Sequence, residues 1–104
     1  MSRNADHVYT APADIARLEA RIADLPDDAR VELHMRDGRV LAGVVAALPT
    51  LQSFYGPGDE EGLNGVLRLE PVDGAAQDLW LDEIEAIRPL TEVELRRFQR
   101  ERPS

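Results

Sequence analysis

The dipeptide Asp37-Gly38 is the feature that most constrains how this chain can fold. It lies between two runs rich in β-forming residues, the first of which begins at Arg30 and alternates apolar with polar residues. Asp-Gly between two such runs is typical of a β-hairpin, because both central residues of a type I′ turn need a positive φ angle. The sequence therefore predicts a hairpin over residues 30–45 with a two-residue turn.

A two-residue turn also predicts which residues face each other across the hairpin. One face is expected to pack in the core and the other to be mostly exposed to solvent. Gly43 lies inside the second strand, where a glycine marks a bend or the close approach of another backbone. The predicted pairs on the core face are Val31 with Val44, Leu33 with Ala42, and Met35 with Val40.

The length and composition of the chain fit a single globular domain over residues 1–104. Its 104 residues are 43% hydrophobic, which suffices for a small core. The absence of cysteine excludes disulfides and thiolate chemistry and fits a reducing compartment. Because no apolar run approaches the ~20 residues of a membrane helix and the N-terminus has no apolar leader, we expect a cytoplasmic protein.

The net charge of −8 is unevenly distributed along the chain. Residues 53–90 hold two arginines and nine acidic residues, a local charge of −7. An acidic surface of this kind repels phosphate backbones. It also keeps a protein soluble, which is the simpler interpretation.

A helix is predicted over residues 10–26, before the hairpin. Thr10 is expected to cap it, Pro12 is tolerated in its first turn, and Pro26 ends it. Residues 1–9 lack periodicity and are predicted to be a loose arm. Four apolar residues at helical spacing form the face expected to pack on the sheet: Ile15, Leu18, Ile22 and Leu25.

A second helix is predicted over residues 91–102. Thr91 and Glu94 have the spacing of a capping box, in which each side chain accepts a hydrogen bond from the other residue's backbone N–H. Leu90 and Leu95 are placed to form a hydrophobic staple across this first turn. We therefore expect a firmly anchored C-terminal helix.

Between the helices, residues 30–90 predict a small antiparallel barrel. The second strand of the hairpin is expected to continue past a break at Pro49, which cannot donate to a ladder. Asp82-Glu83 makes a tight corner between the last two strands. The fold class is therefore mainly β with flanking helices, in the order α-β-β-β-β-β-α. The strands after the hairpin are predicted at 63–72, 77–81 and 84–89.

Two blocks of this sequence resemble the Sm-like (LSm) barrel. They are RVELHMRDGRVLAGVV, over residues 30–45, and LWLDEIEAIRPL, over residues 79–90. Asp37-Gly38 and Gly43 stand where such barrels have a tight turn and a strongly curved strand. The whole chain also resembles an uncharacterised proteobacterial family with an Sm-like variant fold. The resemblance implies a small, strongly bent, five-stranded barrel that assembles through its fourth and fifth strands.

The RNA-binding residues of Sm proteins have no counterpart in this chain. Their first block ends in a loop where an aspartate, an apolar residue and an asparagine hold a base. Here that stretch is ALPTLQSFYGPGDEEG, over residues 47–62. Their second block contacts RNA through a basic pair at the corner before the last strand, where this chain has Asp82-Glu83. RNA binding through the usual Sm site is therefore not expected.

No group of residues has the spacing of a catalytic or cofactor site. His34 lies on the wet face of the hairpin with no nucleophile nearby, which is typical of a solvated histidine. The acidic run Asp59–Glu61 offers oxygen ligands for a hard cation but lacks the alternating spacing of a dedicated site. A solvated loop is the favoured alternative. We therefore expect no enzymatic activity, no cofactor and no metal.

A non-enzymatic assembly or protein-interaction module is the function we expect. Trp80 is predicted to point out of a short edge strand, where aromatic residues favour interfaces; the alternative is that it packs under a helix. We expect a homo-oligomer, and a dimer before a ring, because the C-terminal helix would lie beside the last strand, where a ring neighbour needs space. The predicted interface comprises Leu79, Trp80, Leu81, Ile84, Ile87, Leu95 and Phe98.

The alternative function is RNA binding through a non-standard surface. The C-terminal helix carries four arginines that could contact nucleic acid, but they equally complement the negative end of the helix dipole. An unidentified protein partner is the other open alternative. The four arginines are Arg96, Arg97, Arg100 and Arg102.

Overall fold

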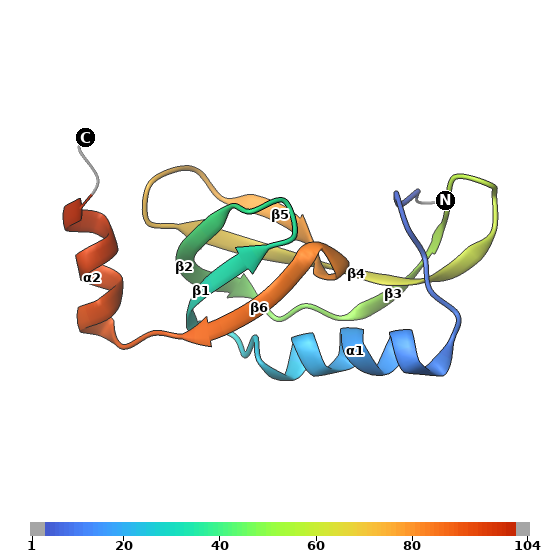
Figure 1. Cartoon of the computed structure of the whole chain (residues 1–104), viewed down its shortest axis with the longest axis horizontal. Helices are drawn as coiled ribbons and strands as arrows, with labels where there is room; N and C mark the ends of the chain where they lie inside the picture. The colour runs from blue at the N-terminus through green and yellow to red at the C-terminus, as the bar shows by residue number, and fades with distance from the viewer. Residues whose placement is uncertain (1–3, 102–104) are drawn as a thin grey trace.

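The computed structural model describes residues 4–101, and side chains through residue 98 (Figure 1). A helix precedes a strongly bent sheet and a second helix follows it. The elements are α1 (Pro12–Ala23), β1 (Arg30–Met35), β2 (Val40–Ala47), β3 (Leu51–Tyr55), β4 (Glu61–Pro71), β5 (Gln77–Trp80), the 3₁₀ turn η1 (Leu81–Glu83), β6 (Ile84–Pro89) and α2 (Glu92–Glu101).

β2 and β3 are two parts of one interrupted strand. Both pair antiparallel with β4, β2 along its C-terminal part and β3 along its N-terminal part, and Pro49 lies in the break between them. β4 also pairs with β5, while β1 lies between β2 and β6. With β2 and β3 counted as one strand, the predicted five-stranded, strongly bent antiparallel architecture with two flanking helices is confirmed.

The loop of the β1–β2 hairpin holds three residues, so the predicted two-residue turn is wrong. Met35 N–H donates to Arg39 O at 2.9 Å, and Gly38 N–H donates to Met35 O at 3.0 Å. Gly38 has a φ of +93°, whereas Asp37 is not in the positive-φ region. This is the three-residue hairpin in which a type I turn precedes one left-handed residue. Asp-Gly therefore marks the hairpin but not the type of its turn.

The extra loop residue shifts β2 by one position and reverses its two faces. Leu41, expected on the wet face, packs against the core, whereas Val40 is 41% exposed. The predicted pairs Val31–Val44, Leu33–Ala42 and Met35–Val40 are therefore wrong. The pairs in the structure are Val31 with Gly43 and Leu33 with Leu41.

Replacing Gly38 by valine should destabilise the hairpin by about 1–3 kcal/mol, the usual cost of a strained backbone conformation. Space is not the cause, because no heavy atom lies within 4 Å of where its Cβ would be. The cause is the φ of +93°, which a β-branched residue adopts at a cost. Gly74→Val is the matched control, because Gly74 has equally open space without a positive φ. Denaturant unfolding measures both variants, and equal midpoint shifts would contradict the turn geometry.

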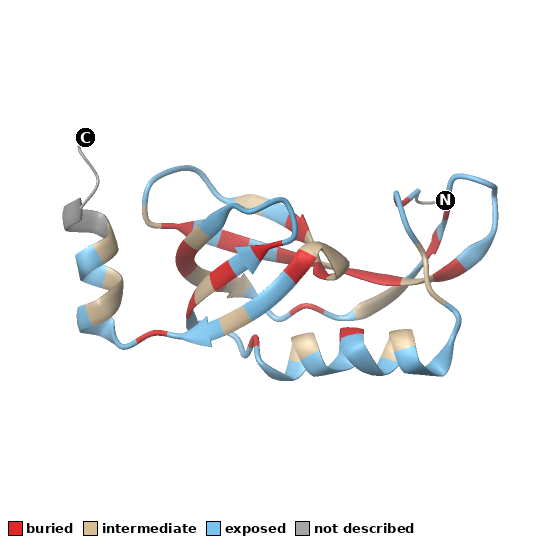
Figure 2. Cartoon of the chain, viewed as in Figure 1, coloured by how far each residue is buried: buried red, intermediate tan, exposed pale blue. Residues whose placement is uncertain are grey.

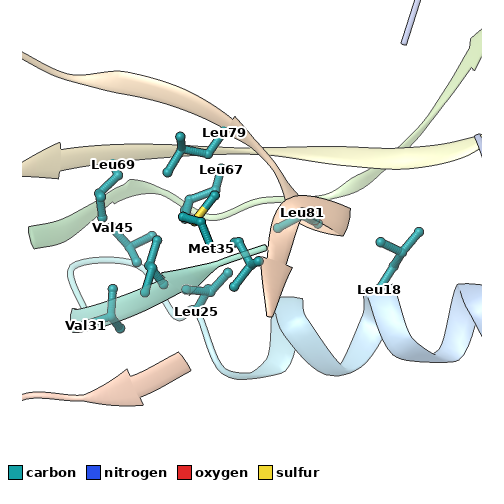
Figure 3. Close-up of a cluster of buried hydrophobic side chains, with 11 residues drawn as sticks. Leu18, Leu25, Val31, Met35, Val45, Leu67, Leu69, Leu79 and Leu81 are labelled. Carbon is teal, nitrogen blue, oxygen red and sulfur yellow. The ribbon is translucent and has the colours of Figure 1, made fainter. Parts of the chain in front are cut away.

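The core lies between the concave side of the bent sheet and α1 (Figures 2 and 3). Leu18 of α1 and Leu25 just after it are buried, Ile22 packs against the cluster, and Ile15 is partly buried. The buried cluster comprises Leu18, Leu25, Val31, Leu33, Met35, Val45, Leu67, Leu69, Leu79, Leu81 and Ile84.

The cap predicted for α1 is wrong. Its N-cap is Ala11, which makes no side-chain cap bond, and Pro12 occupies the start of the helix. Proline tolerates this position because the first amides of a helix have no intrahelical partner. The helix therefore begins without the Thr10 side chain.

Residues 4–9 form an ordered strap, so the expected loose arm is wrong for this stretch; residues 1–3 lie outside the described residues. Ala5 N–H donates to Tyr55 O at 2.9 Å, and Tyr9 and Leu63 exchange two backbone hydrogen bonds of 2.9 and 2.8 Å. The strap crosses the β3–β4 hairpin (Figure 1). Backbone pairing of this kind requires no side-chain periodicity, so the sequence pattern gave no sign of it.

Candidate assembly edges of the open barrel

The barrel is open between β5 and β6. Within the described residues, β5 pairs with β4 alone and β6 pairs with β1 alone. The tight corner η1 joins the two strands (Figure 1), which confirms the predicted corner at Asp82-Glu83. Each strand thus presents one edge to which no other described strand is paired. Sheet edges of this kind recruit further strands.

The free edge of β5 presents the backbone groups of Asp78 and Trp80. Leu63 of β4 exchanges its two hydrogen bonds with the strap, on the side of β4 away from β3. Because bonding direction alternates along an antiparallel strand, Leu67 turns its N–H and C=O to the same side, where it pairs with Leu79. Both backbone groups of Asp78 and the N–H of Trp80 therefore point away from the sheet, whereas the Trp80 C=O, at the N-cap of η1, accepts the first hydrogen bond of that 3₁₀ turn.

The start of the β6 edge is occupied by a side chain of α1. Arg21 donates from Nε to Ile84 O and from Nη2 to Glu85 O, both at 3.0 Å. The guanidinium group satisfies two carbonyls that an incoming strand would otherwise meet. Arg21 was not singled out in the sequence, because a surface arginine on a helix carries no sign of a contact 63 residues away.

The remainder of the β6 edge offers little to a partner strand. Leu90 N–H donates to Arg30 O of β1 at 2.8 Å, so Ile87 and Pro89 turn their backbone groups outward by the same alternation. Pro89 has no N–H to donate. In the described stretch 86–89, Ile87 supplies the one outward N–H. The two edges of the barrel are therefore unequal, with β5 open and β6 blunted.

Three residues predicted for the interface lie in the core of the chain itself. Leu79, Leu81 and Ile84 are 6%, 0% and 1% exposed. Figure 3 shows Leu79 and Leu81 among the buried cluster. Their side chains cannot contact a partner in the folded chain, so this part of the predicted interface is corrected. The remaining predicted residues, Trp80, Ile87, Leu95 and Phe98, are partly buried.

Trp80 packs edge-to-face on Phe54 of β3, with ring centroids 5.1 Å apart and an interplanar angle of 79°. Its aromatic contact is thus with a strand and not with a helix. Phe54 is buried, whereas Trp80 keeps part of its surface exposed. That surface lines a recess together with Ala5 of the strap and Pro57 of the β3–β4 loop. Trp80 therefore stands at the edge of β5 while also supporting the β3–β4 hairpin.

The predicted capping box of α2 is present. Glu94 N–H donates to Thr91 Oγ1 at 3.1 Å, and Thr91 N–H donates to Glu94 Oε1 at 3.0 Å. Arg88 Nη1 donates to the same carboxylate at 2.9 Å, and its Nε donates to Glu32 Oε1 at 3.1 Å. The bond from Thr91 N–H, and next the one from Arg88, hold the pKa of Glu94 below its usual value. Arg88 thus ties the first turn of α2 to β1.

The α2 helix stands beyond the end of β6 and not beside it (Figure 1). It contacts β1 and β2, to which the hydrogen bonds of Leu90 and Arg88 direct the chain. The expectation that this helix fills the space of a neighbour along the last strand is therefore wrong. Its position does not explain why a dimer should be preferred to a ring.

The corner at η1 holds a carboxylate that binds the strap. Asp82, whose side chain is 8% exposed, accepts a bond from Tyr9 Oη at 2.9 Å and one from Asn64 Nδ2 at 3.2 Å. Burial and the bond to Asp82 raise the pKa of Tyr9. Asn64 is 1% exposed, and a polar residue in the apolar run of β4 was the one sign of this cluster in the sequence. Asp82 thus has a structural partner within the chain.

His34 and Glu60, two polar residues singled out in the sequence, have partners of their own. His34 Nε2 lies 2.9 Å from Glu32 Oε1. In the acidic loop, Glu60 Oε2 accepts from Gly58 N–H at 2.8 Å, and the described residues contain no group of three or more His, Cys, Asp or Glu side chains that could hold a metal ion.

The C-terminal arginines lie on α2 and beyond it. Arg96 pairs with Glu92 of the same helix, and Arg97 is exposed. The side chains of Arg100 and Arg102 lie outside the described residues.

In the described part of the chain, no helix is long and apolar enough to cross a membrane.

A crystal structure from Xanthomonas campestris, described as adopting a novel variant of the Sm-like motif, is similar to this chain. The two chains are 39% identical, with a TM-score of 0.83, and the match covers 88% of this chain and 100% of the other. No curated protein matches the chain. Residues 2–90 match the model of the family described as "Domain of unknown function (DUF3247)". The resemblance to Sm-like barrels is thus confirmed, and the chain belongs to the DUF3247 family.

Proposed function

We propose that this protein is a non-enzymatic assembly module that joins copies of itself by strand pairing at the open edge of its barrel. The observation that carries the proposal is the gap between β5 and β6, where the N–H and C=O of Asp78 and the N–H of Trp80 point outward. Unpaired edge groups of this kind are satisfied by pairing with another strand. Sm-like folds commonly oligomerise, and the shared architecture supports the same behaviour here.

The charge of the molecule favours a protein partner over RNA. Residues 53–90, which include the open edge, carry a net charge of −7. Such a surface repels the phosphate groups that dominate the affinity of nucleic-acid complexes. At the corner where Sm proteins have a basic pair, Asp82 holds the strap. A second copy brings the same acidic surface, but it would pair through backbone groups that carry no charge.

A dimer is the assembly we expect. Strand pairing across a two-fold axis is self-complementary and closes after two copies, so it uses the open edge completely. Growth into a ring requires each copy to offer a second, different edge that can accept a strand as well as β5 can. β6 is a poor candidate, because its first two carbonyls already accept hydrogen bonds from Arg21.

The proposal is tested by sedimentation over a dilution series of the wild type, Asp78→Pro and Asp78→Ala. Proline removes an N–H that points away from β4, so no ladder bond is lost. Alanine is the matched control, since it keeps the N–H and loses the same 3.0 Å ion pair with Arg68. We expect the wild type and Asp78→Ala to dimerise at concentrations where Asp78→Pro is monomeric, while all three melt at similar temperatures. A wild type that is monomeric at every concentration would contradict the proposal.

The same series with added U-rich and A-rich RNA oligonucleotides tests the alternative function. We expect no RNA to co-sediment with the protein at near-physiological salt, where non-specific binding is weak. A stable complex under these conditions would favour RNA binding through a non-standard surface.

A further inference from the structure

We infer that the assembling contact is isologous: β5 of one chain pairs antiparallel with β5 of a second copy. This inference rests on the proposed self-association and adds the partner strand, its direction and the register of the contact. It differs from the β5-to-β6 contact that would join Sm-like barrels head to tail through their fourth and fifth strands.

The first support is that the β6 edge cannot accept a full strand. An incoming strand requires alternating donors and acceptors. At the start of β6, the carbonyls of Ile84 and Glu85 accept bonds from Arg21. Near its end, Pro89 has no N–H. Proline and charged side chains on an edge strand are a common means by which natural sheets prevent pairing with another strand. Head-to-tail assembly would therefore rest mainly on the single outward residue Ile87.

The second support is that the β5 edge is complementary to itself. Asp78 and Trp80 lie two positions apart; Asp78 directs an N–H and a C=O outward and Trp80 directs an N–H outward, while the Trp80 C=O also accepts the first bond of η1. In an antiparallel pair with its two-fold axis at Leu79, Asp78 of each chain faces Trp80 of the other copy. The Trp80 N–H of each copy then donates to the Asp78 C=O of the other, and the Asp78 N–H faces the second lone pair of the Trp80 C=O. Every outward group of this short strand is satisfied by the same strand of the second copy.

The third support is geometric, since side chains do not obstruct the edge. Leu79 points into the core, and Trp80 leans on Phe54 of its own chain. The Asp78 carboxylate reaches back to Arg68 of β4. These contacts draw three of the four side chains of β5 towards their own sheet, which leaves its backbone accessible to another strand.

The two-fold pairing has an electrostatic consequence that a test can use. It brings two acidic surfaces together, including Asp6 and Asp59 beside Trp80 in each copy. Repulsion between exposed like charges is screened by salt, over a Debye length of about 10 Å at 0.1 M. The dimer should therefore tighten when the salt concentration is raised.

Site-directed cross-linking distinguishes the possible edges, because the chain contains no cysteine and each introduced thiol is unique. Asp78→Cys places a thiol on β5 and Ala86→Cys places one on β6, both at exposed positions. Each variant alone, and an equimolar mixture, are treated with a bismaleimide. We expect Asp78→Cys to form a covalent dimer by itself and Ala86→Cys to remain single. In the mixture, only the dimer of Asp78→Cys chains should appear.

Each other result overturns the inference. Cross-linking that requires both variants together would demonstrate a head-to-tail contact between β5 and β6. A dimer in sedimentation with no cross-link in any sample would place the contact elsewhere on the chain. Both results leave the proposed self-association intact. A wild type that remains monomeric, and that gives no cross-link even at high salt, overturns the proposed function as well.

Discussion

Replacing Gly43 by alanine should lower the free energy of unfolding by about 3 kcal/mol, the upper part of the usual range for forced overpacking. A Cβ at this position would lie 2.3 Å from Glu70 O and 2.8 Å from the Cα of Pro71. Both atoms belong to the backbone of β4, so no side-chain rotation relieves the contact. β2 and β4 would therefore have to separate where Gly43 pairs with Pro71.

Gly74→Ala is the control for this variant, because nothing lies within 4 Å of the Cβ it would add. Urea unfolding of both variants with the wild type measures the difference. Equal midpoints for Gly43→Ala and Gly74→Ala would show that β4 does not approach β2 as closely as the structure has it. The sequence predicted a bend or a close backbone at Gly43, and the structure confirms the close backbone.

Replacing Leu81 by alanine should cost about 2–5 kcal/mol of folding stability, the usual range for a buried leucine. Leu81 is 0% exposed, and its Cδ1 occupies the space beside Gly65, 2.5 Å from where a Cβ of Gly65 would be. Removing the side chain opens a cavity under the corner that joins β5 to β6. The effect should fall on folding, because the side chain has no surface to offer a partner.

Leu48→Ala is the matched control, since Leu48 is 56% exposed and its truncation should change the midpoint little. Thermal melts at a protein concentration too low for association measure the loss of folding stability separately from any loss of assembly. If Leu81→Ala melts like the wild type but no longer dimerises, Leu81 belongs to the interface first predicted from sequence, and the core assignment is wrong.

The elements that were predictable depend on local patterns. The hairpin follows from Asp37-Gly38, the start of α2 from the capping box at Thr91, and the corner from two acidic residues between short apolar runs. In each, neighbours in sequence decide the conformation. The overall barrel then followed from a resemblance whose two blocks contain the hairpin and the corner.

The features that were not predicted depend on details that a sequence pattern does not contain. Two- and three-residue turns share the Asp-Gly signal, yet the choice between them decides which face of β2 is buried. The strap, and the bonds from Arg21 to β6, join segments that are distant in sequence through backbone atoms. The Leu, Trp and Ile content of the last two strands also suggested an apolar edge, whereas Leu79, Leu81 and Ile84 complete the core and the backbone of β5 forms the edge.

The strap has a practical consequence for anyone who attaches something to this protein. Asn4, the first described residue, lies in the recess that Trp80 lines, next to the β5 edge. α2 ends at the far side of a molecule 44 Å long (Figure 1). An affinity tag or fluorescent fusion on the N-terminal side would emerge beside the strand that is proposed to pair. The same fusion after α2 would leave that strand clear, which makes the C-terminal end the better attachment point.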